Sequence, residues 1–324
     1  MVKSRIYLLN TGNIQRENVE CIHDNSVRID YTKGLREEII RERAGLDPKI
    51  TSGQMFNVLS IETPEQGRVK FETGYVDYVE HICHARAGFA NRKLIDSRFN
   101  ALCTESINRT SDGLIVALRR EKDLPHGPGI YTCAGGYGVH FRGRKTEGGF
   151  TPLNRSDPYD VISFYLGREL RIPEDSFTMK WLGASKCYDL SFDLPVNFFT
   201  QLSHSSSDLL RLRQKSSSAE GIVLDDLINF VEDTPDSIIS LFDLIDVQKE
   251  KLPKDSLGMQ FGENPHTGRL GINDDFIAVL LQHLRVCNSA SYNVAVDVLN
   301  NKRYEVVPVD FELGTKINLE DLRP

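Results

Sequence analysis

Hydrophobic and polar positions alternate over several short runs in the first hundred residues, which is typical of strands. Residues 4–10 form one such run. Residues 55–61 and 68–73 form two more, separated by a segment with proline and glycine, and so predict a hairpin. Residues 33–44 instead place their apolar side chains at helical spacing, and 75–90 are also expected to be helical. The pattern indicates a small mixed α/β unit.

The same alternation continues beyond residue 98, now interrupted by glycine turns and helices. Residues 158–170 predict a helix, because Asp157 suits its N-cap and Pro158 its first turn. Residues 274–286 form the most apolar helix, which we place in the core. Other segments follow the same rules: strands at 101–107, 114–120, 130–136, 179–185 and 193–202, a long loop or hairpin at 142–157, a helix at 235–245, and a closing hairpin over 293–309 around Asn300-Asn301.

Composition narrows the class of protein. The 324 residues carry a net charge of −7 and are 40% hydrophobic, as in a globular protein with a substantial core. An acidic chain lacks the basic field that nonspecific nucleic-acid binding requires, so we expect no nucleic-acid partner. The six cysteines are widely scattered, the N-terminal apolar run is short for a secretory signal, and no run is long enough to span a membrane. We therefore expect a cytoplasmic protein that does not insert into membranes.

The order of motifs from residue 99 onward resembles the Nudix family. The features are the turn Ser111-Asp112-Gly113, the strand 114–120, the turn Ala134-Gly135-Gly136, the tripeptide Arg168-Glu169-Leu170 and the run Trp181-Leu182-Gly183. The resemblance implies an α/β fold, a Nudix-like α/β/α sandwich with a mixed sheet. It also implies glutamates that bind divalent cations and so activate water against a diphosphate. We expect a small α+β N-terminal domain over 1–98 and the Nudix-like domain, with a C-terminal hairpin extension, over 99–324.

The family's box motif is degenerate here, and two registers remain open. If the box ends at Ile172, Arg168 and Glu169 fall on the paired glutamates of the family. If Arg168-Glu169-Leu170 is instead the Arg-Glu-apolar element, Ile172 and Pro173 fall on that pair. Either register keeps one family carboxylate, Glu169. Glu169 also lies on the apolar side of its predicted helix, where a carboxylate is costly unless it is paired or metal-bound. A structural salt bridge would explain the same position.

Several residues complete the expected site. A hard cation such as Mg²⁺ or Mn²⁺ needs several oxygen ligands, so Glu169 requires acidic partners. Glycine amides and arginines suit phosphate groups. The candidates are Glu169 and Glu220 for catalysis, Glu169, Asp157 and Glu147 for the metal, and Arg119, Arg120, Gly135 and Gly136 for the ligand. Each acidic partner could equally be a solvated surface charge.

The N-terminal unit adds a resemblance of layout. A charged helix, an apolar hairpin and an aromatic helix precede the Nudix-like segment, as in a Nudix subgroup that acts on UDP-sugars. The resemblance implies a small-molecule nucleotide ligand, specifically a nucleoside diphosphate derivative such as a nucleotide sugar, hydrolysed with Mg²⁺ at its phosphoanhydride. The missing glutamates support an alternative, a catalytically inactive Nudix-fold module for ligand binding, regulation or protein interaction. The chain is compatible with a homodimer.

Two further groups contain residue types that can bind metal or act as nucleophiles, but their sequence context matches neither kind of site. His81, Cys83 and His84 are close in sequence, but their spacing would crowd a tetrahedral zinc site. Cys133 precedes the glycine turn, yet the sequence places no histidine or aspartate beside it, so we interpret it as a small strand residue rather than a nucleophile.

Overall fold

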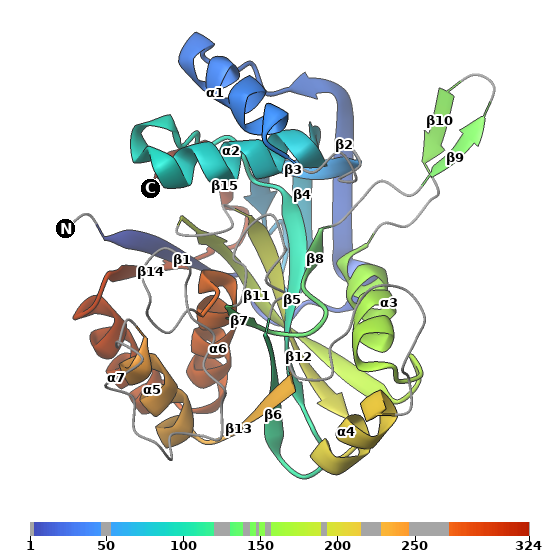
Figure 1. Cartoon of the computed structure of the whole chain (residues 1–324), viewed down its shortest axis with the longest axis vertical. Helices are drawn as coiled ribbons and strands as arrows, with labels where there is room; N and C mark the ends of the chain where they lie inside the picture. Colours follow the sequence, from blue (N-terminus) through green and yellow to red (C-terminus); the bar gives the residue numbers. More distant parts are fainter. Residues whose placement is uncertain are drawn as a thin grey trace.

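The chain folds into a mixed α/β structure built on two sheets. A computed structural model describes residues 3–46, 53–119, 130–138, 143–146, 149–152, 157–188, 193–214, 228–245 and 272–323. In this part of the chain, helices α1 and α2 pack at one end of the small sheet, and one face of that sheet lies on the large sheet (Figure 1). Helices α5, α6 and α7 cover the far face of the large sheet. The α/β class predicted from the sequence is confirmed.

The large sheet holds nine strands within the described residues. Its order is β13-β6-β5-β12-β11-β1-β14, with β7 beside β6 and β8 beside β5. The bounds are β1 Ser4–Asn10, β5 Leu102–Arg109, β6 Leu114–Arg119, β7 Tyr131–Thr132, β8 Tyr137–Gly138, β11 Phe177–Cys187, β12 Leu194–Leu202, β13 Ile228–Glu232 and β14 Tyr304–Asp310. Two pairs are parallel (β12–β5 and β1–β14) and the others along the sheet are antiparallel, so the sheet is mixed.

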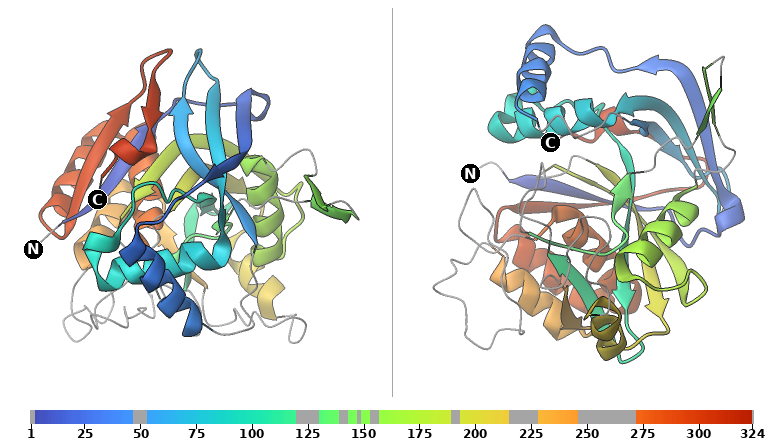
Figure 2. Two further views of the ribbon diagram at one scale, coloured as in Figure 1. Left: turned by 90° about the horizontal axis from the view of Figure 1, so that it is seen from above. Right: turned by 45° about the vertical axis from the view of Figure 1, so that its right-hand side comes forward.

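The small sheet packs one face onto the large sheet and one end onto two helices. Its order is β15-β3-β4-β2. The inner face, with Val58 and Phe71, contacts Trp181 and Phe198 of the large sheet. Helices α1 and α2 pack at the end of the sheet where Met55 and Val76 lie (Figure 2). The bounds are β2 Val19–Arg28, β3 Gln54–Glu62, β4 Val69–Asp77, β15 Lys316–Asn318, α1 Lys33–Ala44 and α2 Tyr78–Ala90. A hairpin of β9 (Gly143–Thr146) and β10 (Gly149–Pro152) stands apart.

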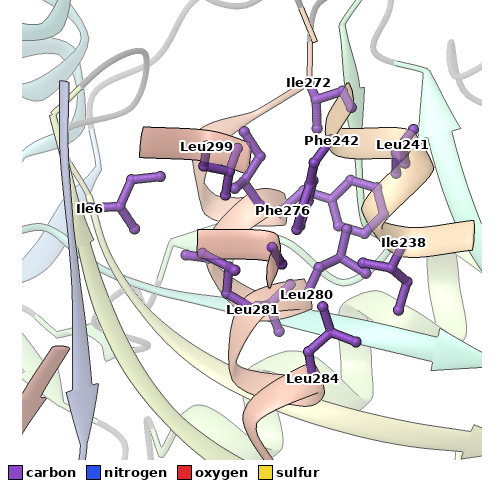
Figure 3. Close-up of a cluster of buried hydrophobic side chains, with 14 of the residues drawn as sticks. Ile6, Ile238, Leu241, Phe242, Ile272, Phe276, Leu280, Leu281, Leu284 and Leu299 are labelled. Carbon is purple, nitrogen blue, oxygen red and sulfur yellow. The ribbon is translucent and has the colours of Figure 1, made fainter. Parts of the chain in front are cut away.

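The largest apolar cluster lies between the large sheet and α6, Asp274–Cys287. Phe276 and Leu280 of α6 meet Ile238 and Phe242 of α5, Pro235–Leu244, and Leu299 of α7 (Figure 3). Burial of α6 is nearly complete along its first eleven residues, as expected for a helix placed in the core. The prediction of a core helix at 274–286 is confirmed.

Helix α3, Pro158–Leu170, covers the opposite face of the large sheet and has the predicted bounds. The Asp157 carboxylate accepts a hydrogen bond from the Asp160 amide at 2.8 Å, and Pro158 occupies the first turn. The helix ends because Arg171 adopts a left-handed conformation, with φ at 59°. A shorter helix, α4 at Ser206–Gln214, was not predicted.

The predicted hairpin over 293–309 is wrong. Residues 293–300 belong to α7, Ser289–Asn300, and only β14 is a strand. The valines at 294, 296 and 298 suggested alternation, but Tyr292, Ala295 and Leu299 are the buried positions, at helical spacing. Asn288 caps the helix by accepting from the Ser291 amide at 3.1 Å. The helix predicted at 75–90 also begins later, because 75–77 continue β4.

The strand pairing does not follow the predicted division at residue 98. Strand β1 lies inside the large sheet, antiparallel to β11 and parallel to β14. Conversely, β15 near the C-terminal end joins β3 of the small sheet. Each end of the chain therefore contributes a strand to the sheet formed mainly by the other part. This exchange ties the two sheets together beyond the apolar contact between them.

Among the described residues, no helix is both long and apolar enough to cross a membrane. None of the six cysteines forms a disulfide.

The helical assignment of α7 predicts different effects for two substitutions on it. Leu299 is fully buried, so Leu299→Ala should lower the free energy of unfolding by about 2–5 kcal/mol. Val294 is 51% exposed. Val294→Ala should change the free energy of unfolding by less than about 0.5 kcal/mol, since alanine favours helices and no contact is lost. Urea denaturation measures both, and a large loss at Val294 would contradict the helix.

Candidate functional site

The glycine turn and α3 meet directly. The Gly135 amide donates a hydrogen bond to Oε2 of Glu169 at 2.6 Å. Gly135 has φ at +83°, a conformation that L side chains rarely adopt, and a Cβ there would lie 3.2 Å from Ile162. The turn therefore packs against the helix without an intervening side chain. Two residues singled out from the sequence, Gly135 and Glu169, are in contact.

Buried side chains of β5 hold the turn from the sheet side. The Thr104 hydroxyl donates to the Gly135 carbonyl at 2.9 Å, and the Asn108 amide donates to the Ala134 carbonyl at 2.9 Å. Both side chains are fully buried, where an unmade hydrogen bond costs about 1–3 kcal/mol. The backbone of the turn is thus fixed between β5 and α3.

Glu105 is a carboxylate at the turn that the sequence reasoning missed. It is 5% exposed, and a Cβ on Gly136 would lie 2.5 Å from its Oε1 atom. The Cys133 thiol donates a hydrogen bond to Glu105. Burial and then the Glu105 charge hold the pKa of Cys133 well above its usual value, so this thiol is not a nucleophile at neutral pH. The signal was available in the sequence, since Glu105 is the one acidic residue of β5, whose other charged residue is Arg109 at its end.

The structure separates Asp157 from the turn. Asp157 caps the first turn of α3, whereas Glu169 lies in the last, so about 18 Å of helix divides them. Asp157 also forms an ion pair with Arg16 at 3.1 Å. It therefore cannot share a metal ion with Glu169, which corrects its place in the predicted ligand set.

Of the other residues that the sequence suggested for the site, the structure describes Arg119 and Gly136. Arg119 is the last residue of β6, and its backbone pairs with Tyr131 of β7, immediately before the turn. Arg120, Glu147 and Glu220 lie outside the described residues. Gly136 belongs to the turn, between Gly135 and β8.

A divalent cation at α3 needs more carboxylates than the described residues supply there. Groups of three or more His, Cys, Asp or Glu side chains with converging ligand atoms are found in the described part only at Cys187, Asp274 and Asp275, on the other face of the large sheet. Hard cations bind several oxygens. Glu169 therefore fits such an ion only together with residues outside the described ranges.

The histidines of α2 are engaged in local contacts. His81 pairs with Asp193, which precedes β12. His84 stacks on Phe99 with ring centroids 3.8 Å apart, and its Nε2 atom accepts from the Asp96 amide at 3.0 Å. Burial and the nearby charges of His81 and Lys186 hold the pKa of His84 well below its usual value. His81 thus joins α2 to the segment before β12, and His84 joins it to the segment before β5.

Comparison with known proteins gives little guidance. No protein-family model and no curated protein matches the chain. Among solved structures, DR0079 from Deinococcus radiodurans is similar, with 14% sequence identity and a TM-score of 0.29. The similarity covers 58% of this chain and 83% of that one. At this TM-score the likeness bears on neither fold nor function.

The close approach of Gly136 to Glu105 predicts a steric penalty. Gly136→Ala should lower the free energy of unfolding by about 1–3 kcal/mol, because a Cβ would overlap the buried carboxylate. Gly34 of α1 is the matched control: nothing lies within 4 Å of its Cβ position, so Gly34→Ala should be neutral or stabilising.

A double-mutant cycle tests whether the Glu105 carboxylate causes the loss of stability in Gly136→Ala. With Glu105→Ala in the background, the cost of Gly136→Ala in chemical denaturation should fall, because the clashing carboxylate is gone. If the losses in unfolding free energy of the two single variants add in the double variant, Glu105 is not the group with which the new Cβ overlaps.

Proposed function

We propose that this chain binds a nucleoside diphosphate derivative, such as a nucleotide sugar, in the cytoplasm, at the Gly135–Gly136 turn beside Glu169. The observation that carries the proposal is the 2.6 Å hydrogen bond from the Gly135 amide to Glu169. It brings together the two elements that the Nudix resemblance assigns to ligand binding, the glycine turn and the box helix. The order of motifs in the sequence led us to expect the ligand between these two elements, and no similarity of a whole chain supports it.

The turn has properties that suit a diphosphate. Thr104 and Asn108 hold the turn from below, so its shape is set before a ligand arrives. Arg119 ends its strand next to the residues that lead into the turn. A guanidinium near that end would add charge-assisted hydrogen bonds to phosphate.

Hydrolysis is the stronger form of the proposal. Mg²⁺ or Mn²⁺, when bound, would polarise the phosphoanhydride and lower the pKa of an attacking water. Glu169 would hold the ion together with Glu220 or Glu147. The chain's own contribution is to fix the Glu169 carboxylate at the turn, since the Gly135 amide holds one of its oxygens.

A non-catalytic ligand-binding or regulatory module is the second candidate. It is supported by the absence of a group of three metal-ligating side chains at α3 within the described residues. The ion pair of Asp157 with Arg16 supports it too, because that carboxylate stabilises the far end of the helix instead. Both candidates share the same binding site and differ only in turnover.

Glu169→Gln separates the candidates with little disturbance of the fold, because the glutamine carbonyl can still accept from the Gly135 amide. The purified chain is incubated with UDP-sugars and other nucleoside diphosphate derivatives, with Mg²⁺, with Mn²⁺ or with a chelator. Metal-dependent release of nucleoside monophosphate should fall at least about 100-fold in Glu169→Gln, on the scale of losing one preorganised electrostatic contact.

Glu174→Gln is the matched control, since Glu174 is exposed just beyond α3, and it should behave like the parent. Nucleotide binding by calorimetry without turnover would favour the non-catalytic module. Turnover that survives in Glu169→Gln would remove Glu169 from the site. No binding of any compound in the panel would contradict the proposal as a whole.

A further inference from the structure

A second group of ligand atoms lies on the other face of the large sheet. Cys187 of β11 and Asp274 and Asp275 of α6 each offer one ligand atom, and these three atoms lie within 4.8 Å of one another. All three side chains are at most 1% exposed. The group is separated from Glu169 by the sheet, because α6 and α3 cover opposite faces.

The local fold fixes these side chains. Cys187 is the last residue of β11 and pairs with Ile6 of β1. The two aspartates form the first turn of α6, whose cap residue Asn273 donates its amide to the Tyr131 carbonyl at 2.7 Å. The start of α6 is therefore anchored to β7, and the three ligands are held by ordered secondary structure on both sides.

The charge around the group is strongly negative. The Asp275 charge acts on three buried thiols, those of Cys103, Cys133 and Cys187, and with burial as the first cause raises the pKa of each. Glu105 adds another buried carboxylate beside Cys103 and Cys133. Lys186 is the cation that acts here, and burial lowers its pKa to about 8. Buried carboxylates at this density are costly unless a cation offsets them.

We propose that Cys187, Asp274 and Asp275 bind one divalent cation of the Zn²⁺ class. A thiolate with two carboxylates matches the ligands of Zn²⁺, whereas Mg²⁺ requires an octahedral oxygen shell. Three protein ligands leave the fourth tetrahedral position for water or a neighbouring donor. The Cys187 thiol now hydrogen-bonds Asp275, so binding replaces this hydrogen bond by a sulfur–metal bond and releases the thiol proton to solvent.

The metal would join the end of β11 to the start of α6. These two elements already pack closely, and α6 carries the apolar residues at the centre of the largest core cluster. Because metal binding requires the folded arrangement of ligands from distant parts of the sequence, it should stabilise the fold by mass action. This role is independent of nucleotide binding at α3.

The test uses the full chain after treatment with a chelator. Titration with Zn²⁺ against a chromophoric chelator should give one site per chain, with an affinity that rises with pH because a proton is released. Co²⁺ in place of Zn²⁺ should give a thiolate-to-cobalt charge-transfer band in the near ultraviolet. Cys187→Ser should abolish that band and weaken Zn²⁺ binding at least about tenfold.

Two comparisons make the result specific. Cys287→Ser, an exposed cysteine at the far end of α6, should keep both the band and the affinity. Asp274→Asn should keep the band but weaken binding, since a neutral amide oxygen replaces the charged carboxylate while the thiolate stays.

Zn²⁺ and Co²⁺ binding by the unmodified chain are enough to contradict the proposal, so the test does not depend on whether the variants fold. No Zn²⁺ binding by the parent, or Co²⁺ binding without a thiolate band, would contradict it. A band that persists in folded Cys187→Ser would assign the site to another thiol and would equally contradict it.

Discussion

The large sheet is covered on both faces, and a polar group inside it is costly unless it finds a partner within the protein. The contacts of its central strands follow from this constraint. The Lys186 ammonium donates a hydrogen bond to the Phe99 carbonyl at 2.7 Å. The side-chain amide of Asn197 donates to the Ser185 hydroxyl and to the Gln282 side-chain carbonyl, each at 2.9 Å. Asn108 reaches the turn before Gly135 in the same way. The shape of the glycine turn thus depends on hydrogen bonds from buried groups of β5.

Local patterns were sufficient for elements whose ends are marked by strong signals. Helix α3 could be predicted to the residue because Asp157 and Pro158 define its start. Segment 293–300 could not, because its valines alternate while its buried positions follow a helical period. The placement of β1 and β15 was also beyond the sequence. Their partners are chosen by long-range pairing, which no local pattern encodes.

The candidate site was predictable in part for a similar reason. Gly135 and Glu169 were identified because turn and helix follow one another in a recognisable order, and they meet in the structure. Asp157 was placed at the same site although the helix length separates it. Glu105, Cys187 and the two aspartates of α6 come from segments far apart in sequence, so only the folded sheet shows that they are neighbours of the turn or of one another.

The central claim is that a nucleoside diphosphate derivative binds where the glycine turn meets α3, and hydrogen exchange with and without a UDP-sugar tests it most directly. Exchange measured by mass spectrometry resolves peptides that cover the turn, α3 and the α6 side of the large sheet. The account predicts slower exchange in peptides covering 130–138 and 158–171 when the ligand is present, with little change in α7 and α1. Protection confined to α1 and the small sheet, or absent throughout at saturating ligand, would contradict it.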